Sequence, residues 1–192
     1  MTTVALFGGS FSPVHAGHIM VASYLAQFTP DIDEVWLLPA ARNPLKTEPY
    51  LLSDDDRVRL LRAAVDGQPR LSVSTVELSM PVPSYTIDTL RHLSATYPDH
   101  RFIWVVGSDN WLLIERWKEW REIIAGFGLI VYPRPGYPVD TSSLPGGVRW
   151  VDAPQVELSS TFIRSGLAAR RDMSAFLPAG VWPLLRRMID RD

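Results

Sequence analysis

The stretch that decides the fold spans residues 4–18 and reads VALFGGSFSPVHAGH. Its first four residues are apolar and end at a pair of glycines, which predicts a buried β-strand over residues 4–7 followed by a tight turn. His18 then begins a predicted helix that extends to Phe28. A strand that leads through glycines into a helix is the opening unit of an α/β sheet, and the start of such a helix favours anions.

The rest of the chain repeats this alternation of strands and helices. The predicted strands are residues 34–38, 71–76, 101–106, 127–132 and 148–151, and the predicted helices are residues 53–66, 85–97, 109–125 (in one or two pieces), 160–169 and 178–189. Segment 101–106 is almost continuously apolar, as expected of a strand that is buried on both faces. The sequence therefore predicts the α/β class, with a doubly wound parallel sheet in a single domain over residues 1–192 and a long loop over residues 133–147.

Composition narrows the class of protein. Of the 192 residues, 46% are hydrophobic and 21% are charged, which excludes a disordered chain. The formal net charge is −2, from 19 basic and 21 acidic residues, and this argues against a nucleic-acid partner. The absence of cysteine excludes a disulfide scaffold, a thiolate nucleophile and a cysteine-ligated metal.

The apolar segments also bear on location. None approaches the roughly 20 residues of a membrane span, and no basic region precedes the apolar run near the N-terminus, so a signal peptide is not expected. We expect a soluble cytoplasmic protein that binds no membrane. The sequence is compatible with a homo-oligomer but does not decide the oligomeric state.

The first candidate site lies within residues 8–18. The glycine pair allows backbone N–H groups to approach a ligand, and Gly17 removes a side chain that would block a purine or a ribose. His15 and His18 are three residues apart, so on a helical turn they share a face and can donate hydrogen bonds to phosphate oxygens. Neither a carboxylate nor a cysteine accompanies them, so a zinc site is not expected.

Two further segments have a functional and a structural interpretation. Asp109, in Gly107-Ser108-Asp109 after a buried strand, suits ribose hydroxyls or Mg²⁺, yet aspartate is also a common helix N-cap. Residues 159–161 place hydroxyl groups ahead of Arg164, which suits a second anion site or a plain capped helix with a surface arginine.

Two loops complete the candidate set. The first carries Arg42, Asn43 and Lys46, which suit another phosphate group, and the second opens a helix at residues 84–86 after a proline turn. The chain lacks the Gly-x-x-x-x-Gly-Lys loop of P-loop kinases, the Gly-x-Gly-x-x-Gly of dinucleotide redox enzymes and the Gly-x-Ser-x-Gly nucleophile elbow.

Together, residues 15–18 (HAGH) and 159–164 (SSTFIR) resemble the His-x-Gly-His and Ser-x-Thr-x-x-Arg signatures of the nucleotidylyltransferase superfamily. Within it, residues 39–46, 84–90 and 107–109, with Trp117, are similar to patterns of the bacterial nicotinate-nucleotide adenylyltransferases. The resemblance is collinear from residue 4 to about residue 164. It departs at Ser12, where the family commonly has aspartate, and at Leu158, where it commonly has isoleucine.

The resemblance implies a Rossmann-like nucleotidylyltransferase fold and transfer of AMP from ATP to nicotinate mononucleotide in NAD biosynthesis. Mg²⁺ would enter with ATP, without a metal site of the protein. The resemblance implies that the helices of residues 159–192 complete the ATP site, that Asp109 faces the ribose or base of ATP, and that Trp117 stacks on the pyridine ring. The implied catalytic residues are His15, His18 and Arg164; those for ATP are Gly8, Gly9, Ser10, Phe11, His15, His18, Gly107, Asp109, Ser159, Ser160, Thr161 and Arg164. Those for nicotinate mononucleotide are Asn43, Lys46, Ser84, Tyr85, Thr86, Trp117 and Arg134.

Three alternatives stay open at this point. An adenylyltransferase acting on phosphopantetheine would share both signatures but should lack the segment at residues 84–86 and Trp117. A catalytically inactive nucleotide-binding regulator need not keep both histidines together with Arg164. An RNA-binding module conflicts with the slightly negative net charge.

Overall fold

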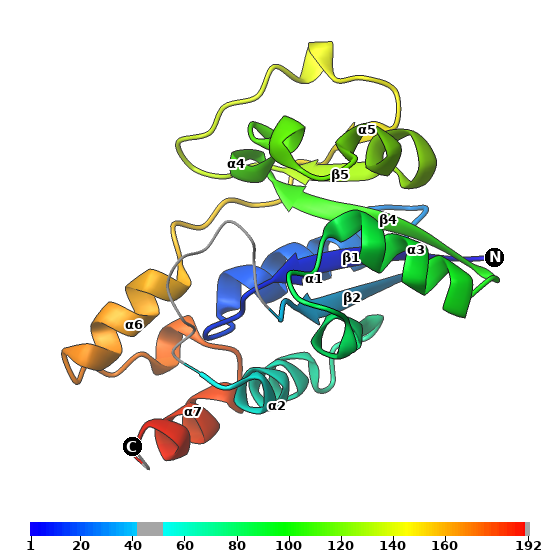
Figure 1. The fold of residues 1–192 in the computed structure, drawn as a ribbon. Helices are drawn as coiled ribbons and strands as arrows, with labels where there is room; N and C mark the ends of the chain where they lie inside the picture. The colour runs from blue at the N-terminus through cyan, green and yellow to red at the C-terminus, as the bar shows by residue number, and fades with distance from the viewer. Residues whose placement is uncertain (42–51, 191–192) are drawn as a thin grey trace.

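The computed structural model describes residues 1–41 and 52–190 and shows a sheet with helices on both faces (Figure 1). The strands are β1 (Thr2–Gly9), β2 (Glu34–Pro39), β3 (Leu71–Val73), β4 (His100–Gly107), β5 (Leu129–Tyr132) and β6 (Val148–Trp150). Their order is β3-β2-β1-β4-β5-β6, and every neighbouring pair is parallel. This confirms the predicted doubly wound sheet, whose strand order reverses between β1 and β4.

The connections between the strands are helices and short helical turns. The α-helices are α1 (Ala16–Phe28), α2 (Asp54–Val65), α3 (Thr86–Thr96), α4 (Ser108–Trp111), α5 (Trp120–Glu122), α6 (Ser160–Ala168) and α7 (Val181–Ile189). The 3₁₀ turns are η1 (Val76–Ser79), η2 (Ile114–Arg116), η4 (Thr141–Ser143) and η5 (Ser174–Phe176), and η3 (Ile123–Phe127) is a π-helical turn.

The central strand β1 contributes to two separate cores. Ala5 and Phe7 pack into a cluster formed with α1, α2, α6 and α7, whereas Val4 and Leu6 pack into a second cluster with α3 and the segment 111–127. Successive side chains of a strand point to opposite faces of a sheet, so an all-apolar strand needs a cover on each face. In Figure 1 the C-terminal helix α7 lies beside α2, far along the chain but in the same layer.

One predicted strand is shorter than expected. Residues 71–76 were expected to be extended, but β3 ends at Val73 and the chain turns into η1. The partner strand explains this, because β2 ends at Pro39, whose ring nitrogen has no N–H to donate to a neighbour. The shorter strand lets residues 76–79 turn beneath the start of α3.

The predicted helix over residues 109–125 is also broken more often than expected. It consists of α4, η2, α5 and η3, and Glu119 between the pieces has a left-handed backbone with φ of 52°. Trp111 and Trp120 are nine residues apart, which would place them on opposite sides of one helix. Because the segment breaks, both tryptophans pack against the same core.

No helix within residues 1–41 and 52–190 is both long enough and apolar enough to cross a bilayer.

Candidate active site

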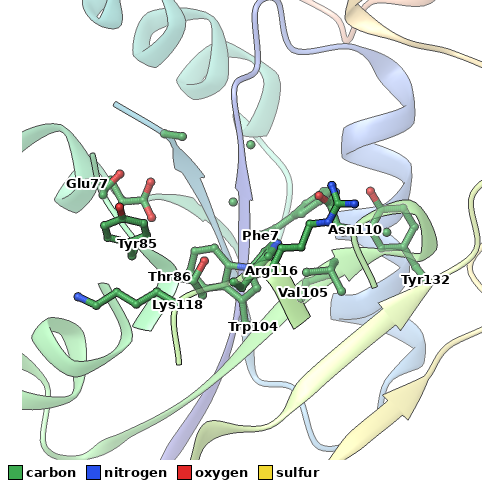
Figure 2. Close-up of a pocket in the computed structure, with 17 residues that line it drawn as sticks. Phe7, Glu77, Tyr85, Thr86, Trp104, Val105, Asn110, Arg116, Lys118 and Tyr132 are labelled. Carbon is green, nitrogen blue, oxygen red and sulfur yellow. The ribbon is translucent and has the colours of Figure 1, made fainter. Parts of the chain in front are cut away.

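Two adjoining cavities lie beyond the carboxyl ends of β1 and β4, where the strand order reverses and where sheets of this kind bind ligands. Phe7 and Tyr132 line both cavities, and their rings meet edge to face with centroids 5.8 Å apart. The first cavity (Figure 2) is lined by Phe7, Gly8, Gly9, Ala40, Glu77, Ser84, Tyr85, Thr86, Trp104, Val105, Val106, Gly107, Asn110, Arg116, Trp117, Lys118 and Tyr132. The second is lined by Phe7, His15, Gly17, His18, Val21, Tyr132, Pro133, Arg134, Pro135, Pro154, Gln155, Val156 and Leu158.

The glycines at the ends of β1 and β4 allow a close approach of neighbouring groups. A Cβ atom at Gly107 would lie 2.4 Å from Oδ1 of Asp109 and 2.8 Å from Cγ of Arg134. A Cβ at Gly9 would lie 2.9 Å from the ring of Phe11, which itself is buried. Any larger residue would push these side chains away. Because these positions are glycines, only backbone atoms line the cavity at the two strand ends.

His15 and His18 stack on each other at the start of α1, with ring centroids 3.7 Å apart. The helix begins at Ala16, two residues earlier than predicted, and His15 is its N-cap. The backbone N–H of His15 donates a hydrogen bond to Nδ1 of His18 over 3.2 Å. Because Nδ1 of His18 accepts, the neutral imidazole carries its proton on Nε2, which becomes its hydrogen-bond donor.

The side chain of His15 is 3% exposed and neutral at neutral pH. Burial lowers the pKa of His15 to about 4, with a further contribution from the positive charge of Arg134. Its Nδ1 atom is buried and has no hydrogen-bond partner among the described residues. His15 is therefore suited to form a hydrogen bond with a ligand in the second cavity as a neutral imidazole, rather than to act as a positively charged imidazolium.

The start of α6 returns to the loop that follows β1. The hydroxyl of Ser160 donates to the carbonyl of Pro13 over 3.0 Å, across 147 residues of sequence. Nη1 of Arg164 donates to the carbonyl of Ser12 over 3.0 Å. The first candidate segment, residues 8–18, and the signature at residues 159–164 therefore meet in space.

The hydroxyl groups at the start of α6 are partly used within the helix. The side chain of Ser159 accepts from the backbone N–H of Phe162 over 3.1 Å, and Thr161 accepts from Nη2 of Arg164 over 3.1 Å. The capped-helix interpretation is thus right for Ser159, while Arg164 is tied to the loop after β1 rather than to the surface alone. The first backbone N–H groups of α6 remain available to an anion, as at any helix start.

A buried arginine that the sequence did not single out joins the same loops. Arg57 in α2 is fully buried, and its guanidinium donates to the carbonyls of Ser10 and Ala40, each over 2.8 Å, and to Asp54 over 2.5 Å. Ser10 follows β1 and Ala40 follows β2, so one side chain fixes the ends of two adjacent strands. The three-residue spacing of Asp54 and Arg57 is a sequence signal for an ion pair, but it does not show that the arginine is buried.

The start of α3 forms one wall of the first cavity. Ser84, Tyr85 and Thr86 lie there with Trp117, whose buried Nε1 atom has no hydrogen-bond partner in the described chain. The hydroxyl of Ser84 interacts with the carboxyl group of Glu77. Buried polar atoms without partners are costly, and at a cavity wall they mark places where a ligand can bind. Asp88 does not line the cavity, and its carboxylate accepts a hydrogen bond of 2.9 Å from Nζ of Lys118, which does.

Some predicted residues lie elsewhere. Arg134 lines the second cavity with His15 and His18, not the first cavity with Tyr85 and Trp117, and its Nε lies 3.8 Å from Oδ1 of Asp109. Arg42, Asn43 and Lys46 are outside the described residues. Among the polar residues that line the first cavity, sequence reasoning missed Glu77, Asn110, Arg116, Lys118 and Tyr132. Asn110, Arg116 and Lys118 adjoin residues that it did select, and this proximity was the available signal.

The two cavities hold no cluster of metal ligands. Within the described ranges, no group of three or more histidine, aspartate, glutamate or cysteine side chains is placed to hold a metal ion. The polar side chains at the second cavity include instead two imidazoles, His15 and His18, at the start of α1, together with Arg134 and Gln155, and such groups suit phosphate.

Comparison with known proteins gives consistent matches over nearly the whole chain. The cytidylyltransferase-like family model matches residues 6–166. The chain is 42% identical to a protein of Bacteroides fragilis named "Probable nicotinate-nucleotide adenylyltransferase", covering 98% of this chain and 94% of that one. It is 43% identical to a protein of the same name from Bacteroides thetaiotaomicron, covering 96% and 91%. In fold, it resembles the Plasmodium falciparum nicotinic acid mononucleotide adenylyltransferase complexed with NaAD, with a TM-score of 0.82, 19% identity and coverage of 98% and 96%.

Proposed function

Because the chain belongs to the cytidylyltransferase-like family and, within it, to the nicotinate-nucleotide adenylyltransferases, we propose that the two cavities bind ATP and nicotinate mononucleotide and join them. The reaction transfers AMP to the mononucleotide, gives nicotinate adenine dinucleotide and pyrophosphate, and belongs to NAD biosynthesis. The observation that carries the assignment of the site is the meeting of the His15–His18 pair and the Ser160–Arg164 segment on one loop, next to the wall formed by Tyr85 and Trp117.

The chemistry needs little beyond alignment and charge neutralisation. An oxygen of the mononucleotide phosphate attacks the α-phosphorus of ATP, a new P–O bond forms, and the bond to the bridging oxygen breaks as pyrophosphate leaves. The attacking phosphate has a second pKa of about 6 and is ionised near neutral pH, so no catalytic base is required. Orientation of the two phosphates and stabilisation of the developing charge account for catalysis.

His18 is placed to donate to the phosphates of ATP. Its Nδ1 is occupied by the backbone N–H of His15, which leaves Nε2–H as the donor of the neutral ring. A donor held in this way needs no reorganisation as charge develops on the phosphate oxygens. His15 has a low pKa and is neutral, so it contributes a second hydrogen-bonding imidazole rather than a second positive charge.

Positive charge at the ATP phosphates comes from Arg164 and the helix starts. Arg164 uses Nη1 and Nη2 to hold Ser12 and Thr161, which fixes the plane of its guanidinium and aims its remaining N–H groups. The starts of α1 and α6 flank the same loop and add their dipoles. Mg²⁺ would enter as the complex with ATP and would neutralise phosphate charge.

The pyridine ring of the mononucleotide belongs in the first cavity. Trp117 offers a flat apolar face, and the start of α3 offers the N–H groups of Thr86 and Ile87, which have no partner within the helix. These donors favour the carboxylate of nicotinate over the neutral amide of nicotinamide, whose NH₂ group would leave them unpaired. Unpaired buried donors can reject an analogue by up to about 10⁴-fold. With ATP as substrate, we place the enzyme in the cytoplasm.

A pyrophosphate-release assay tests the function. Purified protein is supplied with ATP, Mg²⁺ and one acceptor at a time: nicotinate mononucleotide, nicotinamide mononucleotide or phosphopantetheine. We expect the highest kcat/KM with nicotinate mononucleotide and identify the dinucleotide product by mass. The assignment would be contradicted if the protein used phosphopantetheine but neither mononucleotide, or if it used none of the three acceptors.

A further inference from the structure

Glu77 is a buried carboxyl group at the wall of the first cavity that the reaction described above does not use. It lies in η1, beneath the start of α3, and lines the cavity together with Ser84, Tyr85 and Thr86. Figure 2 shows its carboxyl group beside Tyr85 at one end of the cavity, whereas Asn110 and Tyr132 lie at the other end. This end is where the nicotinate carboxylate is expected, so a second carboxyl group stands next to it.

The surroundings of Glu77 favour a neutral carboxyl group. The side chain is 5% exposed, and its Oε1 accepts a hydrogen bond of 2.9 Å from the buried hydroxyl of Thr89. Within the described ranges no cation forms an ion pair with it: Lys118 lines the same cavity but is paired with Asp88, and Arg116 is exposed. Burial raises the pKa of Glu77 to about 7, although the hydroxyls of Thr89 and Ser84 both act in the opposite direction.

The two forms of this carboxyl group recognise different acceptors. A protonated carboxyl has an O–H donor, which can form a short, charge-assisted hydrogen bond with a carboxylate. An ionised carboxyl has only acceptors, so it repels a carboxylate and can accept from the NH₂ of a carboxamide. The other ionisable side chains facing this cavity are Tyr85 from the start of α3, Arg116 and Lys118 from the η2 region, and Tyr132 from β5.

We propose that Glu77 is a specificity-determining residue for the acceptor: in its protonated form it donates a hydrogen bond to the pyridine carboxylate, and in its ionised form it disfavours that carboxylate. The proposal rests on the proposed function, because it assumes that the first cavity holds the pyridine ring. It has a consequence for binding above neutral pH. There, nicotinate mononucleotide must bring a proton into the site, whereas nicotinamide mononucleotide need not.

The first test is the ratio of kcat/KM for the two mononucleotides between pH 6 and pH 9. Both acceptors carry the same phosphate and use the same ATP, so the ratio cancels the titration of those groups. In the wild type we expect the ratio to fall by about tenfold or more as the pH rises, from the loss of one charge-assisted hydrogen bond, with a midpoint near pH 7. Glu77→Gln keeps an N–H donor at every pH, so its ratio should stay constant. Glu115→Gln, which removes an exposed carboxylate, is the matched control and should follow the wild type.

The second test is calorimetric. Calorimetry of nicotinate mononucleotide binding at pH 8, in buffers with different ionisation enthalpies, should show uptake of close to one proton by the wild type and none by Glu77→Gln. A strong preference for nicotinate mononucleotide that does not change with pH, together with no proton uptake, would mean that Glu77 only supports Thr89, and would overturn the proposal while the function stands. Failure to use either mononucleotide at any pH would overturn the function itself.

Discussion

His18 has two separable duties in this structure, and substitutions can distinguish them. Its Nδ1 accepts the backbone N–H of His15 at the start of α1, and its Nε2–H is the donor assigned to ATP. His18→Ala removes both groups. His18→Asn places an amide oxygen near Nδ1 and keeps the acceptor, whereas His18→Gln places an amide NH₂ near Nε2 and keeps the donor.

The magnitudes of the two losses differ. One preorganised donor to developing charge is worth about 10²–10³ in kcat. One intramolecular hydrogen bond contributes about 0.5–1.5 kcal/mol to stability. For a chain of this size, each kcal/mol corresponds to about 2–4 °C in Tm. We therefore expect His18→Ala to lose both activity and Tm, with small changes in either KM. His18→Asn should lose activity at nearly unchanged Tm, and His18→Gln should recover part of kcat at reduced Tm.

The measurements are steady-state pyrophosphate release at saturating ATP and nicotinate mononucleotide, and thermal unfolding followed by circular dichroism. His15 stacks on His18, so near-ultraviolet spectra of each variant check that the loop keeps its packing. If His18→Asn retained kcat within a few-fold of the wild type, Nε2 would not be the catalytic donor and the role of His18 would be limited to the helix start.

Four further outcomes follow from the site. Arg164→Ala should weaken ATP binding in calorimetry by about 10–150-fold, the equivalent of about 1.5–3 kcal/mol, and Arg164→Lys should restore it only in part because lysine lacks the planar fork. Excess chelator should abolish turnover, and full activity without a divalent ion would contradict entry of Mg²⁺ with ATP. His15 has a folded-state pKa near 4, below its unfolded value, so its contribution to the unfolding free energy should fall by at most about 3 kcal/mol as the pH drops from 6.5 to 4. In urea titrations, His15→Asn should not show this pH-dependent loss of stability. Arg57→Met should lower the urea-derived unfolding free energy by about 2–5 kcal/mol, since two strand-end carbonyls lose their donor; a loss below 1 kcal/mol would show that Arg57 does not hold the loops.

Local sequence patterns predicted the elements that rest on local causes. The apolar runs of β1 and β4 reflect burial on both faces of the sheet, and the glycines that end these strands reflect the close approach of neighbouring groups. Both features can be predicted from the residue types alone. The breaks in segment 109–125 could not be predicted in the same way. They let Trp111 and Trp120 pack against one core, and that core is made by residues distant in sequence.

The candidate site shows the same division. His15, His18 and Arg164 belong to short motifs, whereas Arg57 and Glu77 act through burial, which depends on the whole fold. On a helix that begins with three aspartates, Arg57 is expected to be a solvated partner of those charges. Among the described residues it is the largest fully buried side chain, and its contacts reach 47 residues back to Ser10. No spacing rule within α2 contains that information.

The electrostatics of the site explain why neutral histidines suit this reaction. Two anions, a triphosphate and a phosphomonoester, must come together, and pyrophosphate must then leave. A site with two imidazolium groups besides Arg164 and Arg134 would bind the triphosphate and the pyrophosphate tightly as ground states, which slows release without lowering the barrier. Burial keeps His15 uncharged, and the hydrogen bond to Nδ1 of His18 selects the neutral tautomer with its donor on Nε2. In the proposed mechanism, the histidines contribute directed N–H groups, which gain strength as charge builds up on the phosphate oxygens, while the arginines and helix starts supply the constant positive charge.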